Sequence, residues 1–192
     1  MKSFIKNNFA MISKMFIQQI GIAFLGFLLN TAANVSGNKS LVLGLSIFSA
    51  AFYLFLVYVH VWEFGVQDKI RIEAGRIKFD PLKGLKASLI ANSVNILLAV
   101  LSAIGYLCID RNILDEFGNI VSPAWAVNLY AVSHIIGVFL QSMYNGIGSW
   151  FGIDVYPYFL FLAILPSLIT SFFGYYFGTK EKYGLFTSAP KK

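Results

Sequence analysis

The sequence predicts an all-α integral membrane protein, a bundle of helices that crosses the bilayer several times. Of its 192 residues, 57% are hydrophobic and 12% are charged, and the mean hydropathy is +0.69. An ordinary soluble domain has about half its residues apolar and about a quarter charged. The charged residues are also clustered, so that long stretches contain none. We therefore expect a single integral membrane domain over residues 1–192.

Four stretches have the composition and length of a spanning helix, which needs about 20 largely apolar residues. None of them carries Lys or Arg in its interior. These predicted spans cover residues 15–33, 41–62, 85–109 and 157–177.

A fifth stretch, residues 124–144, is long enough to cross but is interrupted by polar side chains. On a helix, His134, Gln141 and Asn145 fall at i, i+7 and i+11, which places them on one face. Such a face requires contact with protein or water. The stretch is therefore either a fifth span or a segment that does not cross.

The distribution of basic residues distinguishes these alternatives, because Lys and Arg in short loops favour the cytoplasmic side. With four spans, thirteen of the 15 Lys and Arg residues lie on that side, against nine with five spans. We therefore favour four spans with both termini cytoplasmic in the cell membrane. Residues 122–156 would then form a re-entrant or interfacial segment rich in glycine.

The loop between the second and third predicted spans, residues 63–86, is the main polar segment. Apolar and basic residues alternate within it on both sides of Gly75. This pattern fits either a small cytoplasmic β-hairpin or a helical extension with a charged face. The basic residues of the pattern are Lys69, Arg71, Arg76 and Lys78. Either structure would present them to anionic headgroups or to the acidic surface of a partner.

Small and polar residues recur at heptad spacing along one face of the third span. They are Ser88, Asn92, Asn95, Ala99, Ser102 and Tyr106. A similar stripe in the first span runs through Gln19, Ala23, Gly26 and Asn30. Such stripes let helices approach closely and hydrogen-bond across their contact. The alternative is a polar path for a solute, lined by Asn92, Asn95, Ser102, His134, Gln141 and Asn145.

His60 and Glu63 lie one turn apart near the cytoplasmic end of the second span. Ionisable residues inside membranes are functional candidates by default. The pair could exchange protons or neutralise each other, and otherwise it marks a solvated helix end.

No catalytic motif, metal-ligand spacing or phosphate-binding loop is present, and Cys108 is the single cysteine. We therefore expect no enzyme, no metal and no cofactor. The net charge of +6 is explained by residues that flank spans, so we expect no nucleic-acid partner. The sequence favours a non-catalytic membrane subunit that associates with itself or with other membrane subunits. The alternative is a component of a channel or small-solute transporter.

Overall fold

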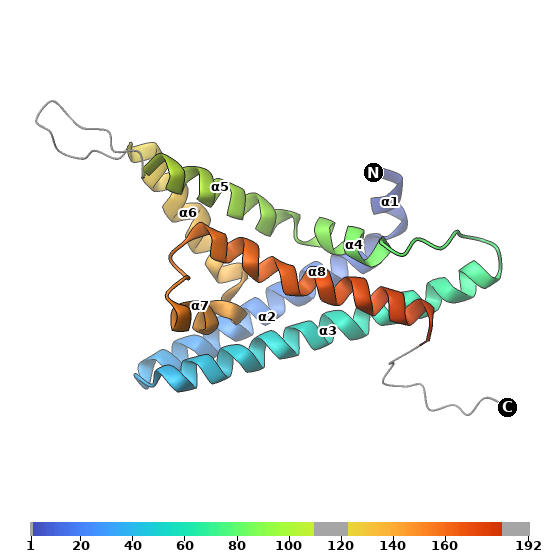
Figure 1. Cartoon of the computed structure of the whole chain (residues 1–192), viewed down its shortest axis with the longest axis horizontal. Coiled ribbons are helices and arrows are strands. Elements are labelled where there is room, and N and C mark those ends of the chain that lie inside the picture. The colour runs from blue at the N-terminus through green and yellow to red at the C-terminus, as the bar shows by residue number, and fades with distance from the viewer. Residues whose placement is uncertain (1, 110–122, 182–192) are drawn as a thin grey trace, which may run out of the picture. The chain divides into compact units, whose positions relative to one another are not determined.

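The computed structural model describes residues 2–109 and 123–181, with side chains from Phe4 onward (Figure 1). These residues form helices and no strand, which confirms the predicted all-α class. The comparison of four and five spans counted Arg111 and the three lysines beyond residue 181. These four residues lie outside the described residues.

Three helices are long and apolar enough to cross a membrane. They are α2 (Phe9–Val35), α3 (Lys39–Glu73) and α8 (Pro157–Thr179). Each of these helices contains one of the predicted spans. Their length and apolar composition are consistent with a membrane protein. A short helix, α1 (Lys2–Asn7), precedes α2.

The remaining helices form two bent pairs. The predicted third span is divided into α4 (Lys83–Ala91) and α5 (Ser93–Ile109), with a bend of 58° between them. The uncertain fifth stretch becomes α6 (Ala124–Leu140), followed by the 3₁₀ turn η1 (Ser142–Tyr144) and α7 (Asn145–Phe151), with a bend of 78°. The described residues therefore hold three candidate spans, or up to five if each bent pair is one span.

The β-hairpin, one of the two alternatives for the segment around Gly75, does not form, since α3 continues through Lys69 and Arg71 to Glu73. Helical spacing brings opposite charges together in this extension. Lys69 Nζ lies 3.7 Å from Glu73 Oε1, and Arg71 Nη1 lies 3.6 Å from Asp68 Oδ1. Gly75 follows the end of α3 with a φ of +68°. The helical alternative therefore holds as far as Glu73, and Arg76 and Lys78 lie beyond the helix.

The chain divides into two compact units, and the three long helices contribute to both. Unit 1 contains residues 1–21, 50–92 and 165–192. Unit 2 contains residues 22–49 and 93–164.

In unit 1, glycines bring α3 and α8 into backbone contact. A Cβ added at Gly174 would lie 3.1 Å from the carbonyl oxygen of Tyr58, and one at Gly178 would clash with that of Trp62. The two contacts advance in the same direction along both helices, so α3 and α8 are parallel here. Close contacts of this kind replace the hydrophobic effect between helices in lipid.

In unit 2, α5 and α6 pack side by side and antiparallel (Figure 1). The chain then turns through η1 and α7 and comes back beside α6, where the Tyr130 hydroxyl donates a hydrogen bond to the carbonyl of Val155. From there α8 runs in the same direction as α6. Leu160 lies against Gly137, and Gln141 Nε2 donates to the Leu160 carbonyl over 3.2 Å.

The packing of unit 1 predicts that Gly65→Ala destabilises the protein. The added Cβ would lie 2.7 Å from the carbonyl oxygen of Tyr175 and 2.9 Å from Gly178 Cα. Overpacking of this kind costs about 1–3 kcal/mol, which thermal unfolding in detergent micelles would measure. Gly21→Ala is the matched control, because a Cβ there meets nothing within 4 Å. Equal effects of the two substitutions would contradict the close approach of α3 and α8.

Candidate functional site

A network of buried hydrogen bonds in unit 2 joins α2 and α3 to the turn after α6. Asn30 Nδ2 donates to the Ser142 carbonyl over 2.7 Å, and Ser46 Oγ donates to Asn30 Oδ1 over 2.9 Å. The Gly146 amide donates to Ser46 Oγ over 2.8 Å. Asn30, Ser46, Ser142 and Gly146 thus form one connected cluster, and we call it the unit 2 network.

The polar stripe predicted on the first span supplies the α2 side of this network. A Cβ added at Gly26 would lie 2.7 Å from the backbone nitrogen of Met143, and the Ser142 hydroxyl donates to the Ala23 carbonyl. The stripe therefore serves a close backbone contact, but not with a second stripe of the same kind. Its partner is the 3₁₀ turn η1, which the sequence analysis placed within a single apolar stretch.

Gln141 lies at the 78° bend and is 2% exposed. Its Nε2 is bonded to α8, whereas its Oε1 has no hydrogen-bond partner within the part of the chain that the structure describes. The side-chain oxygen of Asn145, four residues further along the chain, is also buried and has no hydrogen-bond partner among the described residues. Two amide oxygens are thus buried next to the bend.

His134 is held on both ring nitrogens. Its Nε2 lies 2.8 Å from the Asp154 carbonyl, which can only accept, so this nitrogen carries the proton. Its Nδ1 lies 3.2 Å from Ser102 Oγ, within hydrogen-bonding distance. The ring also stacks on Tyr130, with the centroids 5.0 Å apart. His134 therefore joins α5 and α6 to the segment that precedes α8.

The polar stripe of the third span is divided between the two units at the 58° bend. Asn92 belongs to unit 1, where its Nδ2 lies 2.9 Å from the Ser88 carbonyl and 3.3 Å from Ser167 Oγ on α8. Asn95 and Ser102 belong to unit 2, and Asn95 is 2% exposed. The six residues proposed for one path are therefore buried or half-buried, but the structure does not bring all of them into one unit.

A buried carboxylate in unit 1 was not singled out by the sequence analysis. Asp68 on α3 is 3% exposed. Its Oδ2 lies 2.5 Å from Lys83 Nζ on α4 and accepts the Tyr175 hydroxyl of α8 over 2.8 Å. Both partners are distant in sequence, so no local spacing could have identified this cluster. Asp68 links three helices at one point.

His60 and Glu63 are not brought together. His60 is 5% exposed and packs its ring edge-on against Phe64, with the centroids 5.0 Å apart. Glu63, three residues further along α3, is exposed. No ion pair joins the two among the residues described, so the geometry gives no support to a proton-exchanging pair.

The four basic residues of the predicted contact surface differ in their surroundings. Lys69 lies 2.8 Å from Glu181 Oε2, and this hydrogen bond raises the pKa of the Lys69 ammonium. Arg71 contacts Asp68 at 3.6 Å. Arg76 and Lys78 are exposed and have no ion pair with the described part of the chain.

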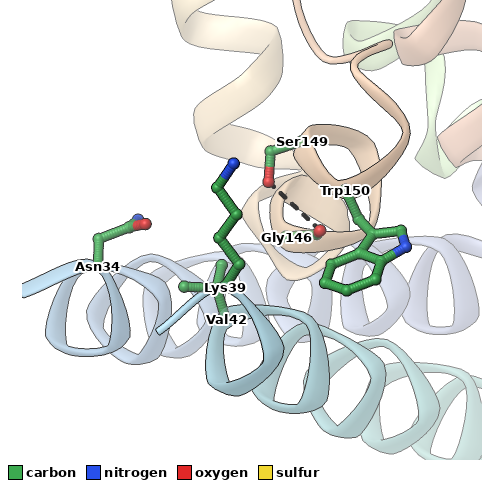
Figure 2. A pocket seen from close by; sticks show the side chains of 6 residues that line it. All are labelled: Asn34, Lys39, Val42, Gly146, Ser149 and Trp150. Atoms are coloured by element: carbon green, nitrogen blue, oxygen red, sulfur yellow. Dashed lines mark hydrogen bonds between the residues drawn. The ribbon is translucent and has the colours of Figure 1, made fainter. Parts of the chain in front are cut away.

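Two cavities carry polar linings. In unit 2, a cavity of about 270 Å³ is lined by Asn34, Lys39, Val42, Gly146, Ser149 and Trp150. Figure 2 shows the Lys39 side chain reaching from the start of α3 toward the α7 side, where Ser149 lies. In unit 1, a cavity of about 400 Å³ is lined by Phe4, Asn7, Asn8, Arg71, Ile77, Lys78, Asp80 and Lys83. We call the second cavity the basic pocket.

Comparison with known proteins gives no relative. No family model, no curated protein and no solved structure matches this chain. The functional interpretation therefore depends on the residues and contacts described above.

The Asp68 cluster predicts a large difference between two Asp→Asn substitutions. Asp68→Asn leaves the Lys83 ammonium without its carboxylate and should cost about 3 kcal/mol, at the low end for a buried pair because Lys83 keeps some water contact. Asp80→Asn breaks the exposed pair with Lys86, 2.7 Å across, and should cost less than about 1 kcal/mol. Reversible unfolding in detergent micelles measures both.

Two further results test this interpretation. Adding Lys83→Met to Asp68→Asn should restore part of the lost stability, because the uncompensated charge is then removed. Equal losses for the Asp68 and Asp80 variants would show that the buried cluster does not hold the three helices together.

Proposed function

We propose that this chain is a non-catalytic, multi-spanning membrane subunit that acts by associating with itself or with other membrane subunits. The observation that carries the proposal is the use of its polar side chains within the helical units. The unit 2 network, the His134 contacts and the Asn92 contact with Ser167 all bond one helix to another. Side chains engaged in this way stabilise packing and leave few groups for a solute.

The proposal includes four spans, formed by α2, α3, the α4–α5 pair and α8, with α6 and α7 as a re-entrant segment. Its support is the parallel course of α6 and α8 in unit 2. If α6 and α7 crossed the bilayer together, α8 would cross in the direction opposite to α6. Parallel helices instead require the chain to return between them. Irregular backbone at this depth is tolerated only where protein or a water-filled cavity covers it, and the unit 2 network supplies protein contacts.

This arrangement places both termini on the cytoplasmic side of the cell membrane, where the positive-inside rule favours Lys and Arg. Large apolar side chains such as Ile17, Leu97 and Ile135 are exposed and would face lipid. Gly44 on α3 has nothing within 4 Å of an added Cβ, so another helix can approach closely there. The basic residues Lys69, Arg71, Arg76 and Lys78 would meet headgroups or a partner on the cytoplasmic side.

The second candidate is a component of a channel or small-solute transporter. It is favoured by the two bent helix pairs, because transporters build substrate sites from broken helices whose irregular backbone lines a cavity. The buried side-chain oxygens of Gln141 and Asn145 next to one bend would then contact water or solute. The two candidates differ in whether the polar faces are hydrated.

Thiol labelling at Asn95 tests the two candidates. In a Cys108→Ala background, the packing proposal expects Asn95→Cys to remain unmodified by a membrane-impermeant maleimide, because the position is 2% exposed. Asn38→Cys, in the exposed turn between α2 and α3, is the reactive control. Leu97→Cys, which is 57% exposed on an apolar face, is the control for lipid contact. Labelling of Asn95→Cys at the rate of Asn38→Cys would favour the transport candidate and contradict the packing proposal.

A further inference from the structure

The basic pocket of unit 1 is built from three separate parts of the chain. Phe4, Asn7 and Asn8 come from α1 and the residue that follows it. Arg71 comes from the end of α3, and Ile77, Lys78, Asp80 and Lys83 come from the connection to α4 and its first residue. With a volume of about 400 Å³, the pocket has room for a small polar group.

The lining of the pocket has an excess of positive charge. It contains three cations, Arg71, Lys78 and Lys83, and one carboxylate, Asp80. Both oxygens of Asp80 are already engaged, since Oδ2 lies 2.7 Å from Lys86 Nζ and Oδ1 accepts the Leu82 amide over 3.1 Å. Asp80 therefore adds little repulsion toward an anion.

The cations differ in what they can still bind. Lys83 is committed to Asp68 at 2.5 Å. Arg71 has only a 3.6 Å contact with the same carboxylate, and Lys78 has no ion pair among the described residues. A guanidinium has five N–H donors and suits bidentate contact with phosphate, and an ammonium acts as a point charge beside it. Arg71 and Lys78 are thus available for an anion that enters the pocket.

The rest of the lining is amphipathic. Asn7 supplies an amide, whereas Asn8 Nδ2 already donates to the Phe4 carbonyl over 2.8 Å, and Phe4 and Ile77 supply apolar walls. α1 leads directly into the apolar helix α2, so the pocket lies where a span meets the headgroup region. A phospholipid offers groups that match this lining. These are a phosphate for the cations, hydroxyl or ester oxygens for the amide, and an apolar glycerol–acyl junction for the apolar walls.

We infer that the basic pocket binds the phosphate-bearing headgroup of an anionic phospholipid, with Arg71 and Lys78 on the phosphate. The inference requires only that the chain is a membrane protein, so it holds for either candidate function. A concave pocket with apolar walls fits one headgroup better than the acidic face of a protein. The cations outside the pocket are half-buried Lys69, which pairs with Glu181 at 2.8 Å, and exposed Arg76, so neither can contact a group inside it.

The test uses the full chain in detergent micelles, which lack the charged surface of a bilayer. The salt concentration is about 0.15 M, which screens the attraction between exposed charges. Native mass spectrometry with equal amounts of phosphatidylglycerol and phosphatidylcholine reports which lipid the protein retains. We expect selective retention of phosphatidylglycerol. Arg71→Gln combined with Lys78→Gln should weaken it about twenty-five-fold, since each cation near an anionic headgroup contributes roughly fivefold.

The matched control is Lys69→Gln combined with Arg76→Gln, which removes the same charge from the same segment outside the pocket. It should retain the lipid preference. A second variant, Ile77→Glu, places a carboxylate on the apolar wall and should also abolish retention. The thermal midpoint of each lipid-free variant separates loss of binding from loss of folding, and the two double variants should lower it little and to a similar extent, because each loses ion pairs near the surface of α3.

Four results would overturn the inference. Equal losses in the two double variants would indicate diffuse electrostatics, and equal retention of both lipids would show that the pocket has no preference for an anionic headgroup. Competition by inorganic phosphate as strong as that by phosphatidylglycerol would identify a site for a soluble anion. A glutamate-rich peptide that binds through Arg71 and Lys78 while the lipid does not would identify a protein partner.

Discussion

Polar groups at membrane depth must find partners inside the protein, because lipid offers none, and the organisation of this chain depends on that constraint. Both helix breaks lie at an amide side chain, Asn92 in one pair and Gln141 in the other. At the first, the Asn92 side chain donates to the Ser88 carbonyl and reaches α8. At the second, Gln141 bonds to α8 and the following turn is held by Asn30. At both breaks the amide side chain at the break itself bonds to α8, and at the second break Asn30 of α2 adds a further bond.

Between helices in lipid, hydrogen bonds and close glycine contacts take the place of the hydrophobic effect. Lipid tails are as apolar as a buried leucine, so burial alone gives no preference for protein over lipid. In unit 1 the backbone contacts at Gly65, Gly84 and Gly178 are completed by Asp68, which binds groups from α4 and α8. A buried carboxylate is costly to desolvate, and with its partners in place it specifies one arrangement of three helices. In unit 2 the Asn30 and His134 contacts have the corresponding role.

The sequence predicted the helical class, the apolar helices and the small and polar stripe of the first span, because composition and heptad spacing report directly on which faces avoid lipid. It did not predict the bend at Asn92, since an asparagine on a polar stripe looks the same in a straight helix and at a break. It also missed Asp68, whose partners lie 15 and 107 positions away. The hairpin was one of two alternatives because alternation in Lys69–Ile72 fits period two, whereas the helical ion pairs of Lys69 and Arg71 stabilise the extension of α3.

The central claim is that the chain turns back between α6 and α8, so that α6 and α7 enter the membrane without crossing it. The measurement that tests this most directly is the side of the membrane on which the C-terminus lies, determined with paired cytoplasmic and external reporters fused after Lys192. Four spans and a re-entrant segment predict that the C-terminus and the N-terminus are both cytoplasmic. An external C-terminus with a cytoplasmic N-terminus would require an odd number of crossings and would contradict the claim.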